Sequence, residues 1–528
     1  MRLRVLILVA AAAATLHAQA PTFDLILRNG RIVDGTGSPW FRGDIAVTGD
    51  TITAVAARID GTARRTLDVN GQVIAPGFID IHTHARRGIN EVPTAANYIR
   101  QGVTTVLEGP DGSSPIPLAP FLAGLDRLQK SVNIGSFIGQ GSVRSAVIGD
   151  VNRRATSDEL IRMQTIVEQG MRDGAFGLST GLYYVPGTFT PVDEVIALAK
   201  VAGRFGGMHE SHMRDETVNV GESVMETIAI GEGGGLPTHI SHHKMVGAAS
   251  WGKSVETLKM VDDARARGVD VTIDVYPYTA SATSVSSALL PAWALEGSRQ
   301  ALLDRLRDPA TRARVKTATI SMIQNERGGG DPKNVQFANC GFDRALAGKT
   351  LADLTQQRGL AVTLENAAEA TLWLVEQGGC AGIFHAISEQ DIVRILTHPA
   401  SMVGSDGEIP IFGTGSPHPR SYGTFARVLG VYVREQRALT LEDAVRKMSS
   451  FPAARLRLTD RGILRPGMKA DIAVFDPDTV RDTATFSQPH QYAEGFSRVI
   501  VNGEVVFENG DMTAARPGRV LYGPGRVQ

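Results

Sequence analysis

The sequence predicts an α/β fold: a TIM-like (β/α)8 barrel, a small β-sandwich domain formed by both termini, and a mostly helical insertion before the last barrel strand. Three observations lead to this prediction. Apolar strands alternate with amphipathic helical stretches through the middle of the chain, and eight such strands can be counted. Short alternating strands separated by turn residues occur near both ends. The composition, 43% hydrophobic and 21% charged among 528 residues, is that of a globular protein with a large core.

The first 20 residues differ from the rest of the chain. Arg2 and Arg4 precede an apolar run over 5–16, and residues 18–20 have the small-x-small sequence Ala-Gln-Ala. This order is typical of a secretory signal peptide, so we expect an exported protein, periplasmic or secreted. A retained membrane anchor is the alternative. The rest of the sequence has no unbroken run of eighteen apolar residues, so we expect no stable membrane span after cleavage.

Residues 21–72 and 452–528 have the pattern of a β domain. Apolar runs of a few residues alternate there with turn sequences, among them Asn502-Gly503, which is typical of a hairpin. Neither piece has enough strands to bury a core alone. We therefore expect the two termini to pair into one β-sandwich domain.

The barrel is expected over residues 73–451. Its eight strands are predicted at 73–82, 103–107, 134–138, 176–179, 207–212, 238–242, 271–276 and 402–405. Helices are expected between them, for example over 158–171 and 255–267. The stretch over about 296–376 is longer than a usual connection, so we interpret it as an insertion between the seventh and eighth strands.

The overall charge and the cysteine count narrow the possible partners. A formal net charge of −1 provides no surplus of cations for binding phosphates, so no nucleic-acid partner is expected. The substrate is expected to be small or neutral, or to be held by local charge. Cys340 and Cys380 can form one disulfide in an oxidising compartment or remain a reduced buried pair. The sequence does not indicate an oligomeric state.

Histidines accumulate at the predicted strand ends. His82 and His84 close the first strand, and their imidazoles lie side by side because residues two apart on a strand share a face. Eight of the eleven histidines beyond residue 20 lie at or near a strand end: His82, His84, His209, His212, His239, His242, His243 and His385. A barrel brings these ends together at one mouth, which indicates a metal site. Among them, His209 and His239 are expected to pack nearby rather than bind metal.

Asp406 follows the last predicted strand and adds a carboxylate to this mouth. Imidazole nitrogens with a hard oxygen suit zinc, with manganese, cobalt or iron as alternatives. A metal ion lowers the pKa of its bound water toward neutrality, which makes hydroxide available at physiological pH. A carboxylate beside that water can accept its proton and pass it to a leaving nitrogen, so Asp406 is the predicted general base and acid.

The chain resembles the amidohydrolase superfamily in residues 76–84 (PGFIDIHTH) and 467–475 (GMKADIAVF). Within it, the chain is most similar to the N-acyl-D-amino-acid deacylases, or D-aminoacylases. The motifs are GVTTV (102–106), LSTGLYYVPG (178–187), SHMR (211–214), ISHHK (240–244), YPYT (276–279), GSDG (404–407) and PHPR (417–420). The resemblance implies the barrel of a metal-dependent hydrolase with one or two zinc ions, and a catalytic Asp406 that also contacts metal. The ligands it implies are His82, His84, His212 and His242.

The chain departs from this family at one ligand position. The family usually has a metal-bridging cysteine in a Gly-Asn-Cys-Gly turn after the second strand, whereas residues 109–112 here are Gly-Pro-Asp-Gly. Aligning the turns makes Asp111 a ligand, with Glu108 as an alternative bridging ligand; Asp111 can also be a plain turn residue. An oxygen ligand leaves the identity and number of the metal ions open. The fourth strand, over 174–180, lacks the metal-bridging carboxylated lysine of isoaspartyl dipeptidases, dihydroorotases and hydantoinases, which disfavours those activities without excluding them.

A D-amino-acid product carries an α-carboxylate, which requires a fixed cation and hydrogen-bond donors. Lys244 and Arg420 lie in suitable motifs, and Tyr184 and Tyr278 resemble the tyrosines that contact substrate in this family. Lys244 can instead pair with a nearby acid as a structural cation.

The predicted function is hydrolysis of an N-acyl-D-amino acid to a carboxylate and a D-amino acid. A dipeptidase (isoaspartyl or D-amino-acid-containing) or a cyclic-amide hydrolase of the same superfamily is the alternative. A non-catalytic binding protein with a degenerate barrel is a third hypothesis. Preference for the D enantiomer rests on the resemblance alone, and the sequence indicates no side-chain or acyl preference.

Overall fold

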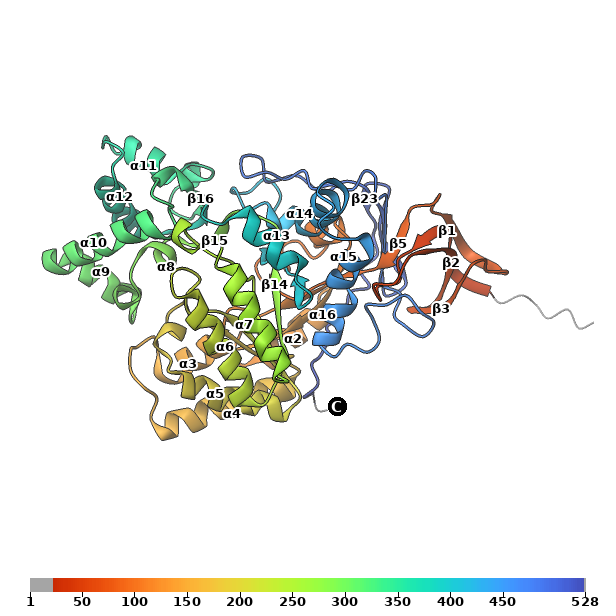
Figure 1. Ribbon diagram of the computed structural model, residues 1–528, viewed down its shortest axis with the longest axis horizontal. Coiled ribbons are helices and arrows are strands. Elements are labelled where there is room, and N and C mark those ends of the chain that lie inside the picture. The colour runs from red at the N-terminus through yellow and green to blue at the C-terminus, as the bar shows by residue number, and fades with distance from the viewer. Residues whose placement is uncertain (1–21, 527–528) are drawn as a thin grey trace, which may run out of the picture.

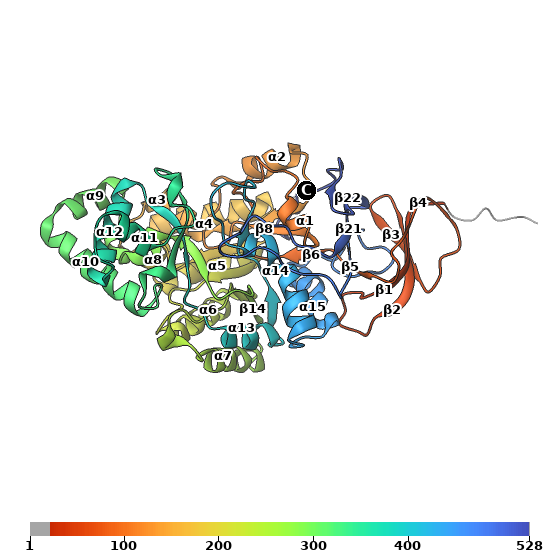
Figure 2. The same ribbon diagram turned by 90° about the horizontal axis from the view of Figure 1, so that it is seen from above.

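The computed structural model describes residues 22–526. The predicted signal peptide over 1–20 lies outside these residues. The molecule is elongated, with the insertion at one end, the barrel in the middle and the β domain at the other end (Figures 1 and 2). Within the described range, no helix is both long and apolar enough to cross a membrane.

The eight-stranded barrel is confirmed. Its strands are β6 (Phe78–Asp80), β8 (Val103–Glu108), β9 (Asn133–Ser136) with its short continuation β10 (Ile138–Gly139), β11 (Gly177–Gly181), β12 (Met208–His212), β13 (Thr238–Ile240), β14 (Val271–Val275) and β18 (Ser401–Val403). They pair in parallel in the orders β6-β8-β9 and β10-β11-β12-β13-β14-β18. Directly after the first and last strands, β7 (Thr83–His84) pairs in parallel with β19 (Gly407–Glu408). This pairing joins the two ends of the barrel at its mouth.

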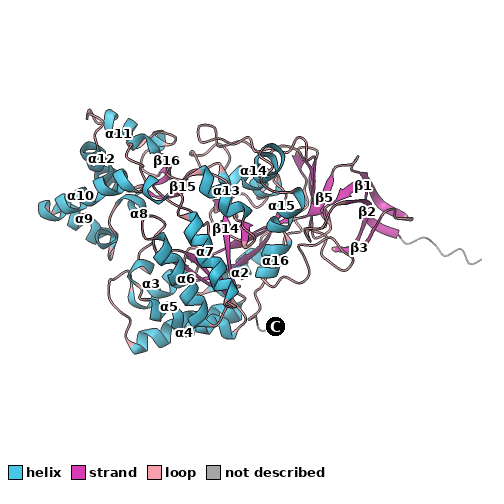
Figure 3. Cartoon of the chain, viewed as in Figure 1, coloured by secondary structure: helices cyan, strands magenta, loops and turns pink. Residues whose placement is uncertain are grey.

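Helices surround the strands (Figure 3). They are α1 (Ala96–Ile99), α2 (Leu118–Arg127), α3 (Gln140–Ile148), α4 (Ser157–Asp173), α5 (Val192–Arg204), α6 (Val220–Gly234), α7 (Ser254–Ala266), α13 (Glu389–Thr397), α14 (Arg420–Arg427), α15 (Leu441–Met448) and α16 (Ser450–Arg455). The longest of these, α4, begins at a capping box between Thr156 and Glu159 and ends at Gly174, whose φ is 115°. The apolar faces of most of these helices share one hydrophobic core with the barrel strands, and α16 packs in a second cluster with residues of β6, β8, β12 and β18.

Both termini contribute to one nine-stranded sheet, so the β domain is composite as predicted. Its strands are β1 (Thr22–Ile32), β2 (Phe41–Thr48), β3 (Thr51–Ala56), β4 (Thr62–Asp68), β5 (Val73–Pro76), β20 (Ile472–Phe475), β21 (Phe496–Val501), β22 (Glu504–Glu508) and β23 (Asp511–Met512). A single hydrophobic cluster includes residues from both chain ends. The predicted hairpin joins β21 to β22, with Asn502 and Gly503 at φ 45° and 84°.

The barrel begins five residues later than predicted. Strand β5 pairs with β1 and β20 of the terminal sheet, so the apolar run starting at Val73 belongs to that sheet. Gly77 separates β5 from β6, and a Cβ there would lie 2.3 Å from Thr104 Oγ1. The predicted strand over 73–82 is therefore two strands of two domains.

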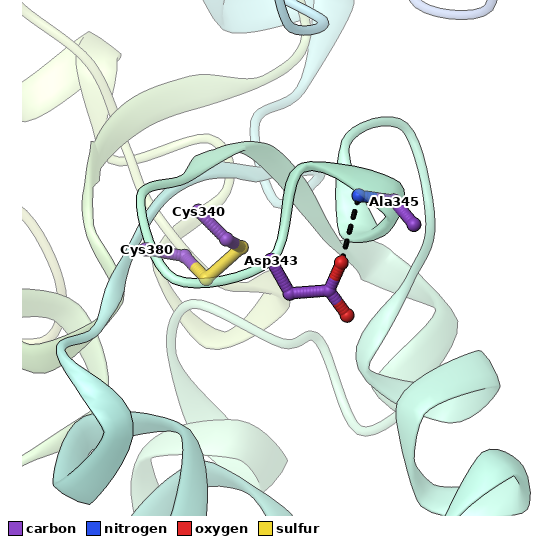
Figure 4. Close-up of a disulfide and its surroundings, with 4 residues drawn as sticks. All are labelled: Cys340, Asp343, Ala345 and Cys380. Carbon is purple, nitrogen blue, oxygen red and sulfur yellow. Dashed lines mark hydrogen bonds between the residues drawn. A yellow bond between two sulfur atoms is a disulfide. The ribbon is translucent and has the colours of Figure 1, made fainter.

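The insertion is larger than the predicted 296–376 and contains its own sheet. Three antiparallel strands in the order β15-β17-β16 form it: β15 (Ser281–Ser284), β16 (Val335–Cys340) and β17 (Cys380–Phe384). Its helices are α8 (Val285–Leu289), α9 (Arg299–Arg307), α10 (Pro309–Asn325), α11 (Leu351–Gln357) and α12 (Leu364–Gln377). Cys340 and Cys380 face each other across β16 and β17 and form a disulfide (Figure 4). Just beyond Cys340, Asp343 accepts a hydrogen bond from the backbone N–H of Ala345 at 2.9 Å.

Candidate metal centre

The side chains predicted as metal ligands converge at the mouth of the barrel, although they follow five different strands. Two groups have ligand atoms within 4.8 Å of one another: His82, His84, Asp111 and Asp406, and Asp111, His212 and His242. Asp111 belongs to both groups. Its carboxylate therefore lies where a ligand shared by two metal positions would lie.

The separations between these atoms match those of ligands around a common ion. Asp111 Oδ1 lies 3.6 Å from His212 Nδ1 and 3.5 Å from His242 Nε2. On the other side, His84 Nε2 lies 3.4 Å from Asp111 Oδ2 and 3.1 Å from Asp406 Oδ1. Tetrahedral ligands held at about 2.0–2.1 Å from zinc are about 3.3 Å apart.

Buried ligand atoms at this centre lack hydrogen-bond partners among residues 22–526. They include His82 Nε2, His212 Nδ1, His242 Nε2 and Asp111 Oδ1. An unsatisfied buried polar atom costs about 1–3 kcal/mol, so a cluster of them is destabilising without an occupant. Imidazole nitrogens and carboxylate oxygens are ligands that zinc accepts. The residues present therefore fit a metal ion.

Three of these residues have a left-handed backbone: Asp111, His242 and Asp406, at φ 55°, 34° and 50°. Such conformations are uncommon outside glycine and cluster at functional sites. Hydrogen bonds hold the two later turns. The backbone N–H of His242 donates to Asp274 Oδ1 at 2.8 Å, and that of Asp406 donates to the carbonyl of His82 at 2.9 Å. These turns follow the strand ends and direct the side chains to one point.

Two buried glutamates that the sequence analysis missed face the far side of the imidazoles. Glu210 Oε1 lies 2.8 Å from His82 Nδ1, and Glu216 Oε1 lies 3.2 Å from His242 Nδ1. A carboxylate at Nδ1 of His82 favours the tautomer whose Nε2 is free to bind metal, whereas Nδ1 of His242 also has Lys244 Nζ at 2.7 Å. Glu210 was detectable, because it lies two residues before His212 on β12 and shares its strand face. Glu216 lies beyond the strand end and gave no such signal.

Asp406 is held as a carboxylate. Burial alone would raise the pKa of its carboxyl, but Arg420 and the imidazoles of His82 and His84 hold that pKa well below its usual range. Arg420 Nη1 lies 2.8 Å from Asp406 Oδ2, and the arginine is itself buried. The carboxylate is therefore ionised at neutral pH and able to accept a proton.

A cavity of about 930 Å³ opens beside this centre. His84, Asp111, Asp406, Arg420 and Tyr184 line it from the barrel side. The Tyr184 ring packs 4.7 Å from the His212 ring between centroids. Of the four residues predicted to bind substrate, Arg420 and Tyr184 line this cavity.

Lys244 is not among the residues that line this cavity. Its buried Nζ pairs with the Glu216 carboxylate and lies 3.0 Å from the carbonyl of His242. It corresponds to the alternative prediction, a structural cation. Glu216 also forms an ion pair with Arg327 of the insertion, whose Nη2 lies 3.2 Å from Glu216 Oε2.

Tyr278 is not among the residues that line the cavity, and Glu108 is not in either ligand group. The backbone N–H of Tyr278 donates to the carbonyl of Tyr276 at 3.0 Å, so the chain turns back there, and the Tyr278 hydroxyl donates to Asp482 at 3.4 Å instead of lining the cavity. The Glu108 carboxylate accepts the backbone N–H of Arg86 at 2.8 Å and belongs to neither ligand group. Of the two predicted bridging carboxylates, only Asp111 lies at the centre.

A (β/α)8 barrel with histidine and aspartate ligands at its strand ends is the architecture of a metal-dependent hydrolase. The chain belongs to the amidohydrolase family, whose model matches residues 65–507. It is 34% identical to a D-aminoacylase of Alcaligenes xylosoxydans xylosoxydans over 96% of this chain and 99% of that protein. It is 35% identical to an N-acyl-D-glutamate deacylase of the same organism, over 94% and 96% of the two chains.

A solved structure of a related deacylase has the same fold. The N-acyl-D-glutamate deacylase from Bordetella bronchiseptica, complexed with zinc and a phosphonate inhibitor that mimics the tetrahedral intermediate, superposes with a TM-score of 0.81. It shares 33% identity, and the match covers 95% of this chain and 100% of that one.

Proposed function

We propose that this protein hydrolyses the amide bond of N-acyl-D-amino acids at a zinc centre in the barrel mouth. The observation that carries the proposal is the position of Asp111, whose carboxylate lies within 3.6 Å of imidazole nitrogens of both His84 and His212 while Asp406 lies beside it. The relatives named D-aminoacylase and N-acyl-D-glutamate deacylase support the amide substrate. Zinc is supported by the imidazole ligands and by its presence in the related solved structure.

The residues of this chain divide the chemistry among them. When bound, the metal supplies a Lewis acid that polarises the acyl carbonyl and lowers the pKa of water. Asp406 accepts the proton of the attacking water and delivers it to the leaving nitrogen. Arg420 keeps Asp406 ionised and presents a buried guanidinium to the cavity, where it can bind the α-carboxylate of the substrate. Tyr184 lines the same space.

A substrate panel tests this function. Purified protein supplied with zinc is incubated with paired N-acetyl-D- and N-acetyl-L-amino acids, isoaspartyl and D-amino-acid dipeptides, and hydantoins. We expect release of acetate from the D-amides to exceed every other reaction. Faster cleavage of dipeptides or hydantoins would establish the alternative activity, and inactivity of a zinc-loaded protein on all substrates would leave only a binding role.

We also propose that the protein is exported. The disulfide between Cys340 and Cys380 supports this, because such bonds persist mainly in oxidising compartments. Amino-terminal sequencing of the protein recovered from the periplasm or medium is expected to begin near residue 21. A mature chain that retains residues 1–20 would contradict cleavage of a signal peptide.

A further inference from the structure

One wall of the cavity comes from the insertion, and we call the lining residues between 281 and 384 the insertion wall. They are alanines, glycines, hydroxyl residues, one asparagine and one disulfide cysteine: Ala282, Thr283, Ser284, Ser286, Ser287, Ala338, Asn339, Gly341, Gly378, Gly379, Cys380, Ala381 and Gly382. Because many of these side chains are small, the wall presents backbone peptide groups beside hydroxyls and one carboxamide. Such groups bind a polar ligand by hydrogen bonds.

The sheet of the insertion places Asn339 on this wall. Ala381 of β17 is in register with Ser284 of β15 on one side and with Asn339 of β16 on the other, so the three residues share one face of the sheet. All three line the cavity. The disulfide pair Cys340–Cys380 is the adjacent register position, so it fixes β16 against β17 next to Asn339.

A β-bulge lies where Asn339 meets the cavity. The register of β16 against β17 shifts between Phe337 and Asn339, so Ala338 is an extra residue on β16. Consecutive residues of a regular strand point to opposite faces, whereas Ala338 and Asn339 both line the cavity. The carbonyl of Ala338 accepts the backbone N–H of Ser416 at 2.7 Å, which attaches the bulge to the loop before α14. Asn339 is therefore held at a fixed position on the wall.

The Asn339 carboxamide is free to bind a ligand. Asn339 is exposed, and its side chain makes no hydrogen bond to any other residue over 22–526. By contrast, Gln336 of the same strand donates from Nε2 to the carbonyl of Phe486 at 3.0 Å. A carboxamide can donate to a peptide carbonyl and accept from a peptide N–H. An alkyl chain offers neither group.

The cavity is larger than a simple N-acetyl amino acid needs. An apolar cavity of about 150 Å³ holds one benzene molecule, so N-acetyl-D-leucine, which has twice as many non-hydrogen atoms, needs about 300 Å³. The cavity of about 930 Å³ is lined both by Asp406 at the centre and by Asn339 at the wall. The amino acid that the reaction releases is a single residue, so the acyl group is the part of the substrate that can extend into the remaining space.

We propose that the insertion wall binds a peptidyl acyl group, with Asn339 hydrogen-bonded to its backbone, so that the preferred substrates are amino-terminally blocked peptides ending in a D-amino acid. This inference rests on the proposed function and specifies the acyl group of its substrate. The reaction is unchanged: the last C–N amide bond breaks, and water supplies a hydroxyl group to the peptidyl carbonyl and a proton to the leaving nitrogen.

The test compares acyl groups on one D-amino acid. We expect kcat/KM for N-acetyl-alanyl-alanyl-D-leucine to exceed that for N-acetyl-D-leucine about tenfold, since the acyl group gains hydrogen bonds at the wall. N-octanoyl-D-leucine, with an alkyl chain of the same length, is expected to gain less. Each probe carries one carboxylate, so Arg87 and Arg420, which also line the cavity, meet the same charge in all three.

The outcomes separate this inference from the proposed function. If the peptidyl probe is hydrolysed no faster than either of the other two, the inference is overturned and the proposed function stands. Absence of hydrolysis of every probe would overturn the proposed function itself.

Variants of Asn339 provide the second arm. Asn339→Leu keeps the approximate size but removes the carboxamide, and we expect it to lower the ratio of kcat/KM between the peptidyl and octanoyl probes about fivefold. Asn339→Gln retains a carboxamide and is the matched control, which is expected to keep the ratio. Zinc content and the melting temperature identify a misfolded variant, and the comparison of probes on the unmodified protein needs no variant. If Asn339→Leu folds and keeps the wild-type ratio, Asn339 does not bind the acyl group.

Discussion

The two walls of this cavity are built from opposite kinds of residue. The barrel wall presents ionisable side chains from the ends of several strands, some on left-handed turns fixed by hydrogen bonds to neighbouring strands. The insertion wall presents small neutral groups from one antiparallel sheet, held by a disulfide. The barrel can fix several charged groups because its strand ends share one mouth. The insertion lies in one connection between strands and touches the charged groups of the barrel through Arg327, which pairs with Glu216.

The comparison predicts that changes at the barrel wall abolish chemistry without altering selectivity. Asp406→Asn keeps the shape of the side chain but removes its basicity, so we expect kcat to fall by up to about 10⁴-fold. Zinc content and melting temperature are expected to stay close to wild type. Steady-state kinetics on an N-acetyl-D-amino acid measures the effect, and a variant with more than a tenth of wild-type kcat would remove Asp406 from its proposed role.

A substitution at Asp111 tests whether this residue is a ligand shared by two metal positions or a plain turn residue. Structural zinc sites bind with about 10–16 kcal/mol over four ligands, so Asp111→Ala is expected to weaken zinc binding by about 3 kcal/mol, or about 10²-fold. Glu108→Gln is the matched control, because Glu108 pairs with Arg86 outside the centre. Calorimetric titration of metal-free protein with zinc makes the measurement. Equal losses in the two variants would show that Asp111 holds no metal.

Removing the disulfide between Cys340 and Cys380 tests whether the insertion wall can lose stability without affecting the metal centre of the barrel wall. The bond closes a loop with a sequence separation of 40, so replacing both cysteines by serine is expected to destabilise the insertion by about 2–4 kcal/mol. Faster hydrogen exchange in β16 and β17 is the expected readout, with zinc content unchanged because the candidate ligands all lie in the barrel. Loss of zinc in the double variant would mean that the two walls are not independent.

A smaller effect is expected from His209, deep in the barrel. Burial, with a contribution from His239, lowers the pKa of His209 to about 3, so the folded protein keeps this imidazole neutral where the unfolded chain protonates it below about pH 6.5. The corresponding stability is present above pH 6.5 and is lost as the pH falls toward 3. We expect the free energy of unfolding to drop by about 2 kcal/mol between pH 7.5 and 5 from this group. His209→Gln is expected to show a shallower pH dependence in urea unfolding, and an unchanged slope would refute the assignment.

The sequence predicted the barrel well because short strand-like segments, some of them apolar runs and some of them motifs rich in histidine and serine, alternate with amphipathic helical stretches. The prediction failed between Val73 and Asp80, where one apolar run contains a strand of the β domain and a strand of the barrel. Hydrophobicity alone does not reveal which sheet a strand joins. The edge strand β15 was missed because its sequence, SATS, carries little hydrophobic signal, and the central strand β17, CAGIF, is a short run interrupted by a glycine.

The residues of the candidate site also divide into those that the sequence could place and those that it could not. Imidazoles at strand ends could be placed from spacing, because the barrel fixes where those ends meet. The pairing of Lys244 with Glu216 and the turn that redirects Tyr278 depend on contacts between distant segments or on local backbone hydrogen bonds, which no spacing rule encodes.

The most direct measurement is a crystal structure of zinc-loaded protein recorded at the zinc absorption edge. We expect anomalous density in contact with the Asp111 carboxylate and within bonding distance of imidazole nitrogens from His82 and His84, from His212 and His242, or from both pairs. Zinc bound away from Asp111, or a loaded protein with an empty barrel mouth, would contradict the account.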